Sequence, residues 1–342
     1  MDAAADRRTL LDARLVAPDA SEPGLYVEFR GERRALLFDL GDLHDVRPAA
    51  LLRVSHAFVT HTHMDHFAGF DALLQVVLGR HERLVLYGGP GFVDQVEHKL
   101  RAYTWNVVHR YETPLVIEAV EVGVDGAGRR AAFSSLRRFE REGDAPFAPA
   151  GDVLHDEPTF RVRARFVDHD IPCLAYALEE KAALRVRREQ LEALGLTTGA
   201  WLRDLKHAVL HGAPGDTPIR LEWRDRAGAH AQTRAVQALR SLVLEEVPGR
   251  RIGYVTDLRG TEADRAQLAA LLQGVDLLFI ESVFLDADRG HAERKNHLTA
   301  RRAGAIARHV GAKEVVPFHF SPRYQGREQA LVDELRAAWA GE

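Results

Sequence analysis

Three histidines and one aspartate occur within six residues of this chain, and their setting constrains the fold more than any other feature. His61, His63, Asp65 and His66 follow an apolar, strand-like run at residues 54–59 and lead into a helical pattern. Side chains on a turn between a strand and a helix can point inward at one spot. The segment therefore favours an α/β fold with a polar site where a strand ends.

The types of these four side chains indicate a metal site. Neutral imidazole and carboxylate groups are the ligands that Zn²⁺ prefers where thiolates are absent. The spacing also divides into two sets, because His61 and His63 can converge on one ion while Asp65 and His66 turn to a second. A histidine-rich surface loop is the alternative. A lone His-x-His pair would favour that loop, whereas the full pattern after a strand favours a metal site.

The rest of the chain alternates strand and helix patterns, which extends the α/β prediction. Apolar and β-branched runs predict strands at residues 25–30, 35–39, 84–87, 115–122, 160–167, 174–178, 242–247, 251–256, 277–280 and 314–318. Apolar residues at helical spacing predict helices at residues 67–79, 92–103, 187–194, 201–209, 262–272, 299–310 and 327–339. Residues 125–150 are arginine-rich with Gly and Pro, and they predict a long loop or hairpin.

Residues 185–235 differ in composition from the segments on either side. Between Arg185 and Arg240 there are ten Lys/Arg against six Asp/Glu. This surplus fits a mildly basic insertion, although a solvated protein face would have the same composition. We therefore expect one domain made of residues 1–184 and 236–342, interrupted by the insertion.

Composition excludes several classes of protein. The 342 residues are 46% hydrophobic and carry a formal charge of −4, which argues against nucleic-acid binding through bulk charge but not against a local basic patch. The single cysteine, Cys173, excludes an internal disulfide framework and fits a reducing compartment. Residues 1–8 do not resemble a signal peptide, and no apolar run reaches the ~20 residues that span a bilayer. We expect a soluble, cytoplasmic protein with no membrane partner.

A site for two metal ions needs about seven or eight ligands, so further ligands are expected at other strand ends. His169, Asp257 and His319 each follow an apolar strand pattern directly. Taken singly, each would more often be a capping or turn residue, but together with the loop they predict the remaining ligands. His297 stands where a helix begins, so its ring could face the same site beside the helix amides.

The chain resembles the metallo-β-lactamase superfamily, and within it the ribonuclease Z group of tRNA 3′-processing endonucleases. The metal-loop motif alone resembles the whole superfamily. Three later segments narrow the resemblance: Asp168-His169-Asp170-Ile171-Pro172, His297-Leu298-Thr299-Ala300 and His319-Phe320-Ser321-Pro322-Arg323-Tyr324. The similarity spans roughly residues 25–324. It implies a four-layer αββα sandwich with an inserted helical arm at residues 185–235, which could serve as an exosite for substrate.

The resemblance implies a role for each candidate ligand. A first zinc ion would be held by His61, His63 and His169. A second zinc ion would be held by Asp65, His66 and His319, and Asp257 would bridge the two ions. Asp39 would orient the loop from behind, as outer carboxylates do in metal sites. Mn²⁺ or Fe could bind the same ligands.

The resemblance also implies a catalytic mechanism. A metal-activated water would attack phosphorus, and Asp65 would belong to the catalytic residues. His297, oriented by Glu281, would donate a proton to the leaving ribose 3′-oxygen. Ser321 and Arg323 would grip the phosphate, the arginine through its bidentate fork.

Two departures from the family pattern concern the substrate. The Gly-Pro element of the family's arm is missing from the matching residues 196–206, and the His-Glu-Ala-Thr stretch of the family reads Ile280-Glu281-Ser282-Val283. We expect a zinc-dependent endoribonuclease that cleaves precursor tRNA on its 3′ side, and by family resemblance a homodimer. The alternatives are a phosphodiesterase on small or cyclic-nucleotide substrates, a non-catalytic RNA-binding scaffold, and a thioesterase or lactonase.

Overall fold

The structure, a computed structural model, divides into two compact units. It describes residues 10–17, 19, 21–30, 32–225 and 228–342. Residues 1–8, considered above for a signal peptide, lie outside this described part. The larger unit consists of Asp12–His155, Val162–Leu178 and Arg251–Glu342, and the smaller unit of Met1–Leu11, Asp156–Arg161 and Glu179–Arg250. No helix of the described residues is long and apolar enough to cross a membrane.

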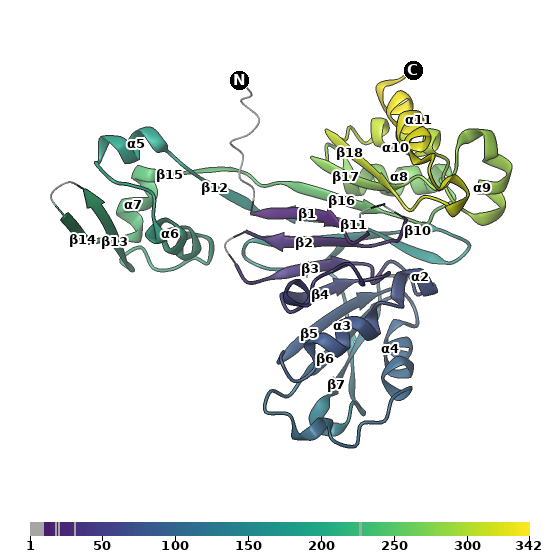
Figure 1. Cartoon of the computed structure of the whole chain (residues 1–342), viewed down its shortest axis with the longest axis horizontal. Coiled ribbons are helices and arrows are strands. Elements are labelled where there is room, and N and C mark those ends of the chain that lie inside the picture. Colours follow the sequence, from purple (N-terminus) through teal and green to yellow (C-terminus); the bar gives the residue numbers. More distant parts are fainter. Residues whose placement is uncertain (1–9, 18, 20, 31, 226–227) are drawn as a thin grey trace. The chain divides into compact units, whose positions relative to one another are not determined.

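The larger unit contains two β-sheets (Figure 1). The first has the order β1 (Leu11–Leu15), β2 (Leu25–Phe29), β3 (Ala35–Phe38), β4 (Val54–Phe58), β5 (Arg83–Gly88), β6 (Val116–Val122), β7 (Gly128–Ser134), β8 (Arg141–Phe147). Its central strands β3 to β6 are parallel. The second has the order β18 (Glu314–Phe318), β17 (Leu277–Glu281), β16 (Arg251–Val255), β11 (Pro172–Glu180), β10 (Phe160–Asp168), β9 (Val153–Asp156). Strands β16, β17 and β18 are parallel. The antiparallel pairing of β7 with β8 confirms the hairpin expected within residues 125–150.

Helices complete the larger unit and confirm the four-layer αββα sandwich. They are α1 (Pro48–Leu51), α2 (Met64–Phe67), α3 (Phe70–Val77), α4 (Phe92–Arg101), α8 (Glu262–Leu272), α9 (Arg289–Lys295), α10 (Ala300–His309) and α11 (Glu328–Ala340). The apolar stripes of α3 and α4 bury Leu73 and Val96 in the core cluster that also holds Leu86 of β5 and Ile117 of β6. Buried apolar residues recur every three or four positions along α3 and along α4, so each helix has one apolar face that packs on the first sheet.

A layer of aromatic rings lies between the two sheets. The Phe38 ring is 5.2 Å from that of Phe58 on its own sheet, and 5.6 Å and 6.0 Å from those of Tyr176 and Tyr254 on the other. All four side chains are fully buried. Aromatic pairs of this kind contribute about 0.5–1.5 kcal/mol each beyond the area they bury, so the layer fixes the spacing of the sheets.

The loop that carries the four clustered candidate ligands packs against the residues after β3 through a close contact at Gly69. The helix predicted at residues 67–79 is observed as α3, and the short helix α2 precedes it within the loop that carries His63 and His66. A Cβ added to Gly69 would lie 2.0 Å from the carbonyl oxygen of Gly41, and the Gly69 amide donates a hydrogen bond to the carbonyl of Leu40 at 2.8 Å. Only glycine permits this close approach. The contact fixes where the loop sits relative to Asp39.

The smaller unit has its own apolar core. It contains the antiparallel pair β12 (Ala182–Val186) and β15 (Leu244–Pro248), the hairpin β13 (Pro218–Asp225) and β14 (Gly228–Ala235), and the helices α5 (Arg188–Ala193), α6 (Ala200–Leu210) and α7 (Val236–Val243). Trp201, Leu205, Leu221 and Leu239 belong to the buried cluster. The strand predicted at 242–247 begins only at Leu244, because Val236, Leu239 and Val243 form one buried face of α7.

Candidate metal centre

The carboxyl ends of the strands deliver the predicted site residues. Asp39 follows β3, His61 follows β4, His169 follows β10, and Asp257 and His319 follow β16 and β18. Parallel strands of one sheet end at the same edge, which places Asp39 near His61 on the first sheet and Asp257 near His319 on the second.

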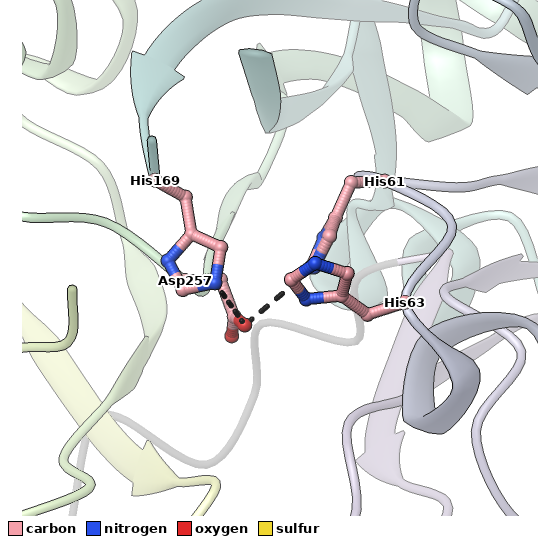
Figure 2. Close-up of side chains that lie close together, drawn as sticks. All are labelled: His61, His63, His169 and Asp257. Carbon is pink, nitrogen blue, oxygen red and sulfur yellow. Dashed lines mark ion pairs between the residues drawn. The ribbon is translucent and has the colours of Figure 1, made fainter. Parts of the chain in front are cut away.

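Four of the predicted ligands form a first group: His61, His63, His169 and Asp257 (Figure 2). One ligand atom of each lies within 4.8 Å of those of the other three. Oδ2 of Asp257 lies 3.6 Å from Nε2 of His61 and 3.3 Å from Nε2 of His169. Three members are buried and His63 is exposed, so the group opens to solvent at His63.

Asp65, His66 and His319 form a second group, whose ligand atoms also lie within 4.8 Å of one another. Nε2 of His66 lies 3.6 Å from Asp65 and 3.4 Å from Oδ2 of Asp257. The imidazole of His319 faces Asp65 at 3.5 Å through Nε2 and Asp257 at 3.0 Å through Nδ1. Asp257 therefore touches both groups, and the structure brings together all seven candidate ligands.

The chemistry of this donor set fits a divalent metal ion. Nδ1 of three rings has a hydrogen-bond partner behind the site: Thr60 Oγ1 for His61 at 3.1 Å, Asp39 for His66 at 2.8 Å, and the Asn296 carbonyl for His169 at 2.8 Å. Nε2 of His61 and Nε2 of His66 are buried and have no hydrogen-bond partner among the described residues. A partner on Nδ1 leaves the lone pair on Nε2, which is how proteins orient histidine ligands.

The pKa values of two buried rings reflect the same arrangement. Burial lowers the pKa of His61 to about 2, so this ring is neutral, as a metal ligand must be. Burial also opposes protonation of His66, but the charges of Asp257 and Asp39 outweigh it and raise its pKa to about 10. These carboxylates favour positive charge beside His66, and a divalent cation would provide that charge while the ring stays neutral.

Asp39 accepts four hydrogen bonds and holds the loop from behind. Thr60 donates its backbone N–H at 2.7 Å and its hydroxyl at 3.0 Å, His66 donates Nδ1–H at 2.8 Å, and the Tyr254 hydroxyl donates at 3.0 Å. The sequence predicted Asp39 in this position but not Thr60 or Tyr254. Nothing in an alternating strand pattern distinguishes a tyrosine that meets a carboxylate from one that only fills the core.

Glu281 and His297 form a hydrogen-bonded pair beside Asp257. Oε2 of Glu281 accepts from Nδ1 of His297 at 2.9 Å and from the backbone N–H of Asp257 at 2.8 Å. The His297 ring lies 5.0 Å from the ring of His169 and 5.5 Å from that of His319. Burial raises and the charge of His297 lowers the pKa of Glu281, with a net shift downward, so the carboxylate is ionised. The pair therefore lies beside the candidate ligands, and its role in proton transfer stays a prediction.

Ser321 and Arg323 are engaged with their own segment. The Ser321 hydroxyl accepts a 3.4 Å hydrogen bond from the Arg323 backbone at the start of a short 3₁₀ turn. The Arg323 guanidinium lies 3.0 Å from Asp288 through Nη1 and remains 43% exposed, so its other nitrogen atoms can still reach a ligand. A phosphate grip by these two residues stays a prediction.

Several site residues have left-handed backbone conformations. The φ angle is 58° at Asp39, 52° at Asp257 and 59° at His319, and it is also positive at the neighbouring Asp170 and Asn296. Residues other than glycine rarely adopt this region, and each costs of order 1 kcal/mol or more. These turns direct the three side chains into the site directly after their strands end.

The chain is similar to known proteins over nearly its whole length. A profile of the beta-lactamase superfamily domain matches residues 152–320, which include His169 and Asp257 but not the loop at residues 61–66. A ribonuclease Z of Deinococcus radiodurans is 32% identical over 336 residues, 97% of this chain and 96% of the relative. A ribonuclease Z of Natronomonas pharaonis is 27% identical and covers 98% of this chain and 94% of the relative. The crystal structure of human tRNase Z, short form (ELAC1), shares the fold with a TM-score of 0.53 and 18% identity, over 92% of each chain.

Proposed function

This chain belongs to the ribonuclease Z family of metal-dependent hydrolases with the metallo-β-lactamase fold, and we propose that it is a zinc-dependent endoribonuclease that cleaves precursor tRNA on the 3′ side. One observation supports this most strongly. Asp257 stands between two groups of metal-ligating side chains, and the Glu281–His297 pair lies directly beside it. A hydrolase that breaks a phosphodiester needs both a place for cations and a group that can protonate the leaving oxygen.

The two groups define how the ions would be held. His61, His63 and His169 would bind one zinc ion. Asp65, His66 and His319 would bind the other, with Asp257 shared between them. When bound, the ions supply positive charge next to the phosphate and a water of lowered pKa.

His297 would supply the proton for the leaving group. In the proposed reaction a water oxygen bonds to phosphorus and the water releases one proton to solvent. The bond from phosphorus to the ribose 3′-oxygen breaks, and that oxygen takes a proton from His297. Glu281 accepts from Nδ1 of His297 and so fixes the ring orientation, leaving Nε2 for the substrate. The products carry a 3′-hydroxyl and a 5′-phosphate.

Residues 185–235 would contribute recognition of the tRNA body. They lie in the smaller unit, which has its own apolar core and therefore needs no apolar contact with substrate to be ordered. Ten Lys/Arg against six Asp/Glu between Arg185 and Arg240 favour contact with a polyanion. We assign to this segment the role of a substrate exosite.

A comparison of substrates tests the proposed function. Purified, zinc-loaded protein is assayed on precursor tRNA with a 3′ trailer, on bis(p-nitrophenyl) phosphate and on cyclic nucleotides. We expect cleavage of the tRNA at one position and loss of that cleavage in His63→Ala, with His309→Ala as an exposed histidine control. Activity confined to the small substrates would overturn the proposal in favour of a small-molecule phosphodiesterase.

A further inference from the structure

The helix α9 (Arg289–Lys295), labelled in Figure 1, ends two residues before His297. The helix ends at Lys295, Asn296 follows with a left-handed backbone, and the backbone N–H of His297 donates a 3.0 Å hydrogen bond back to the Ala292 carbonyl. Residues of this turn therefore stand at a fixed distance from His297. We call His291, Arg294 and Lys295 the α9 rim.

Ring contacts connect the α9 rim to the site. The Phe284 ring lies 6.3 Å from the ring of His297 and 5.0 Å from that of His291. A guanidinium nitrogen of Arg294 lies 3.3 Å from Nδ1 of His291. Phe284 and His291 thus form a series of neighbouring rings that connects His297 with the guanidinium of Arg294. Phe284 is buried and serves as a spacer, whereas Arg294 is exposed.

The positive charge of the α9 rim is not neutralised by neighbouring carboxylates. Each acid of this segment already has a cation partner: Asp286 with Arg289, Asp288 with Arg323, and Glu293 with Arg302. Arg294 and Lys295 are exposed and pair with no carboxylate of the described residues. Burial, followed by the charges of Arg323, Arg294 and Lys295, lowers the pKa of His291, and the charge of Asp288 opposes this shift. An excess of two positive charges therefore faces solvent next to the site.

We propose that the α9 rim binds the RNA backbone on the 5′ side of the scissile phosphate. This inference rests on the proposed function, because a proton donated by His297 to the leaving 3′-oxygen places the 5′ nucleotide next to His297. Exposed cations beside a planar ring are the combination that holds single-stranded nucleic acid, through phosphate contacts and stacking. The substrate class that this surface selects is a polynucleotide with unpaired residues before the cut, not a small diester.

The alternative role of Arg294 and Lys295 is to stabilise α9, since cations at the carboxyl end of a helix complement its dipole. That role would affect thermal stability and leave the substrate KM unchanged. Binding of RNA would affect the KM and its dependence on salt. The two explanations therefore make different predictions for the same variant.

The test compares Arg294→Ala/Lys295→Ala with the charge-matched control Arg80→Ala/Arg110→Ala, which removes two exposed cations elsewhere in the larger unit. For the α9 variant we expect the KM for precursor tRNA to rise about tenfold, with kcat unchanged. The slope of log(kcat/KM) against log[KCl] should become shallower by about 1.5, because each phosphate contact contributes about 0.7–0.9. Hydrolysis of bis(p-nitrophenyl) phosphate should stay at the wild-type rate. A KM and salt slope equal to those of the control would overturn the proposal.

Inhibition by the two cleavage products tests whether the α9 rim contacts the RNA on the 5′ side of the scissile phosphate. The α9 variant should bind mature RNA with a 3′-hydroxyl more weakly, with its affinity for a 5′-phosphorylated trailer unchanged. A loss confined to the trailer would overturn the 5′-side assignment. If the wild-type protein cleaves small diesters but no RNA, the proposed function fails on its own. Binding of a fluorescent single-stranded RNA then tests whether the α9 rim binds RNA. The proposal is rejected if the α9 variant binds this RNA as tightly as the control variant does, or if the wild type does not bind it.

Discussion

The hydroxyl of Tyr254 donates a 3.0 Å hydrogen bond to Oδ2 of Asp39, which lies 215 positions earlier in the chain. Tyr254 belongs to β16 of the second sheet, and Asp39 follows β3 of the first. The same carboxylate oxygen accepts from Nδ1 of His66 at 2.8 Å. Tyr254 on the second sheet thus holds the carboxylate of Asp39, which in turn orients the ring of His66 beside the first sheet.

Tyr254→Phe should weaken metal binding. The substitution keeps the ring in the aromatic layer and removes only the hydroxyl, so Asp39 is less firmly held behind His66. Loss of such an outer partner typically lowers metal affinity by about 10–100-fold, and we expect about tenfold. Competition with a chromophoric zinc chelator measures the change. Tyr176→Phe is the matched control, because it removes a buried hydroxyl that donates to the Val59 carbonyl at 2.7 Å. An equal loss in both variants would show that Tyr254 has no particular role at the metal.

His297→Ala should distinguish between leaving groups. The ribose 3′-oxygen needs a proton as it departs, whereas p-nitrophenolate leaves as a stable anion. We therefore expect kcat on precursor tRNA to fall about 10²–10⁴-fold, the usual contribution of a general acid, with little change on bis(p-nitrophenyl) phosphate. Steady-state kinetics on both substrates provide the measurement, and zinc content checks that the site is intact. Equal losses on both substrates would assign His297 to structure rather than to proton transfer.

Removal of the inserted segment should weaken binding of precursor tRNA and leave hydrolysis of a small diester unchanged. Val186 pairs with Leu244, and the Arg187 amide donates to the Val243 carbonyl at 2.9 Å, so residues 187 and 243 lie opposite each other directly beyond the paired ends of β12 and β15. Residues 188–242 can therefore be replaced by Asn-Gly, which forms a two-residue hairpin turn. We expect the shortened protein to hydrolyse bis(p-nitrophenyl) phosphate normally and to lose affinity for precursor tRNA. Unchanged tRNA cleavage would rule out an exosite in this segment.

The free energy of unfolding should rise with free zinc at the rate expected for two bound ions. Each tenfold rise in free zinc above the dissociation constant adds about 1.4 kcal/mol per ion to the free energy of unfolding. The slope for the wild-type protein should correspond to two ions, and metal analysis should find two per chain. Denaturant titrations at buffered zinc concentrations measure this slope. A slope for one ion would contradict the assignment of two ligand groups around Asp257.

Asp152 should stabilise the fold only above strongly acidic pH. Its carboxylate accepts hydrogen bonds from Arg163 at 2.9 Å and 2.6 Å and from Arg165 at 3.1 Å. The Arg163 hydrogen bond, against a smaller effect of burial, lowers the pKa of Asp152. The folded state thus favours the ionised form, so this stabilisation is present above the unfolded pKa and is lost as the pH falls through the lower folded pKa.

Asp152→Asn should therefore reduce the free energy of unfolding by about 1 kcal/mol at neutral pH, a value discounted for partial exposure. The wild type and the variant should converge once the pH falls below the lowered pKa of Asp152 in the folded state. Urea denaturation across this range gives both results. Asp333→Asn, at an exposed carboxylate, serves as the control and should match the wild type throughout. A difference between Asp152→Asn and the wild type that persists at low pH would mean a steric rather than an electrostatic effect.

Local spacing and strand ends were enough to predict which ligand candidates converge. His61, His63, Asp65 and His66 lie on one turn, so their sequence separation already limits their distance. His169, Asp257 and His319 were predicted because parallel strands end at one edge. The four-layer fold followed from family resemblance rather than from composition.

Contacts behind the site could not be predicted in the same way. The bond from Tyr254 to Asp39 depends on the distance between two sheets, which their aromatic layer sets and no strand pattern encodes. The last two residues of the α7 helix, Leu242 and Val243, were predicted as the start of a strand, because apolar residues suit either structure until the surrounding core is known. The α9 rim was also missed, since an exposed Arg-Lys pair matters only once its distance from His297 is fixed.

The left-handed backbone at Asp39, Asp257 and His319 limits how far this protein can be made thermostable. Glycine at any of these positions would relieve the backbone strain but remove a side chain of the centre. At Asp39 it would also leave the buried donors of Thr60 and Tyr254 without their acceptor. The backbone strain is therefore retained as long as the centre is intact. Thermostability and catalysis compete at these three positions. Stabilising substitutions compatible with activity must be sought elsewhere, in surfaces that hold no strand end of the site.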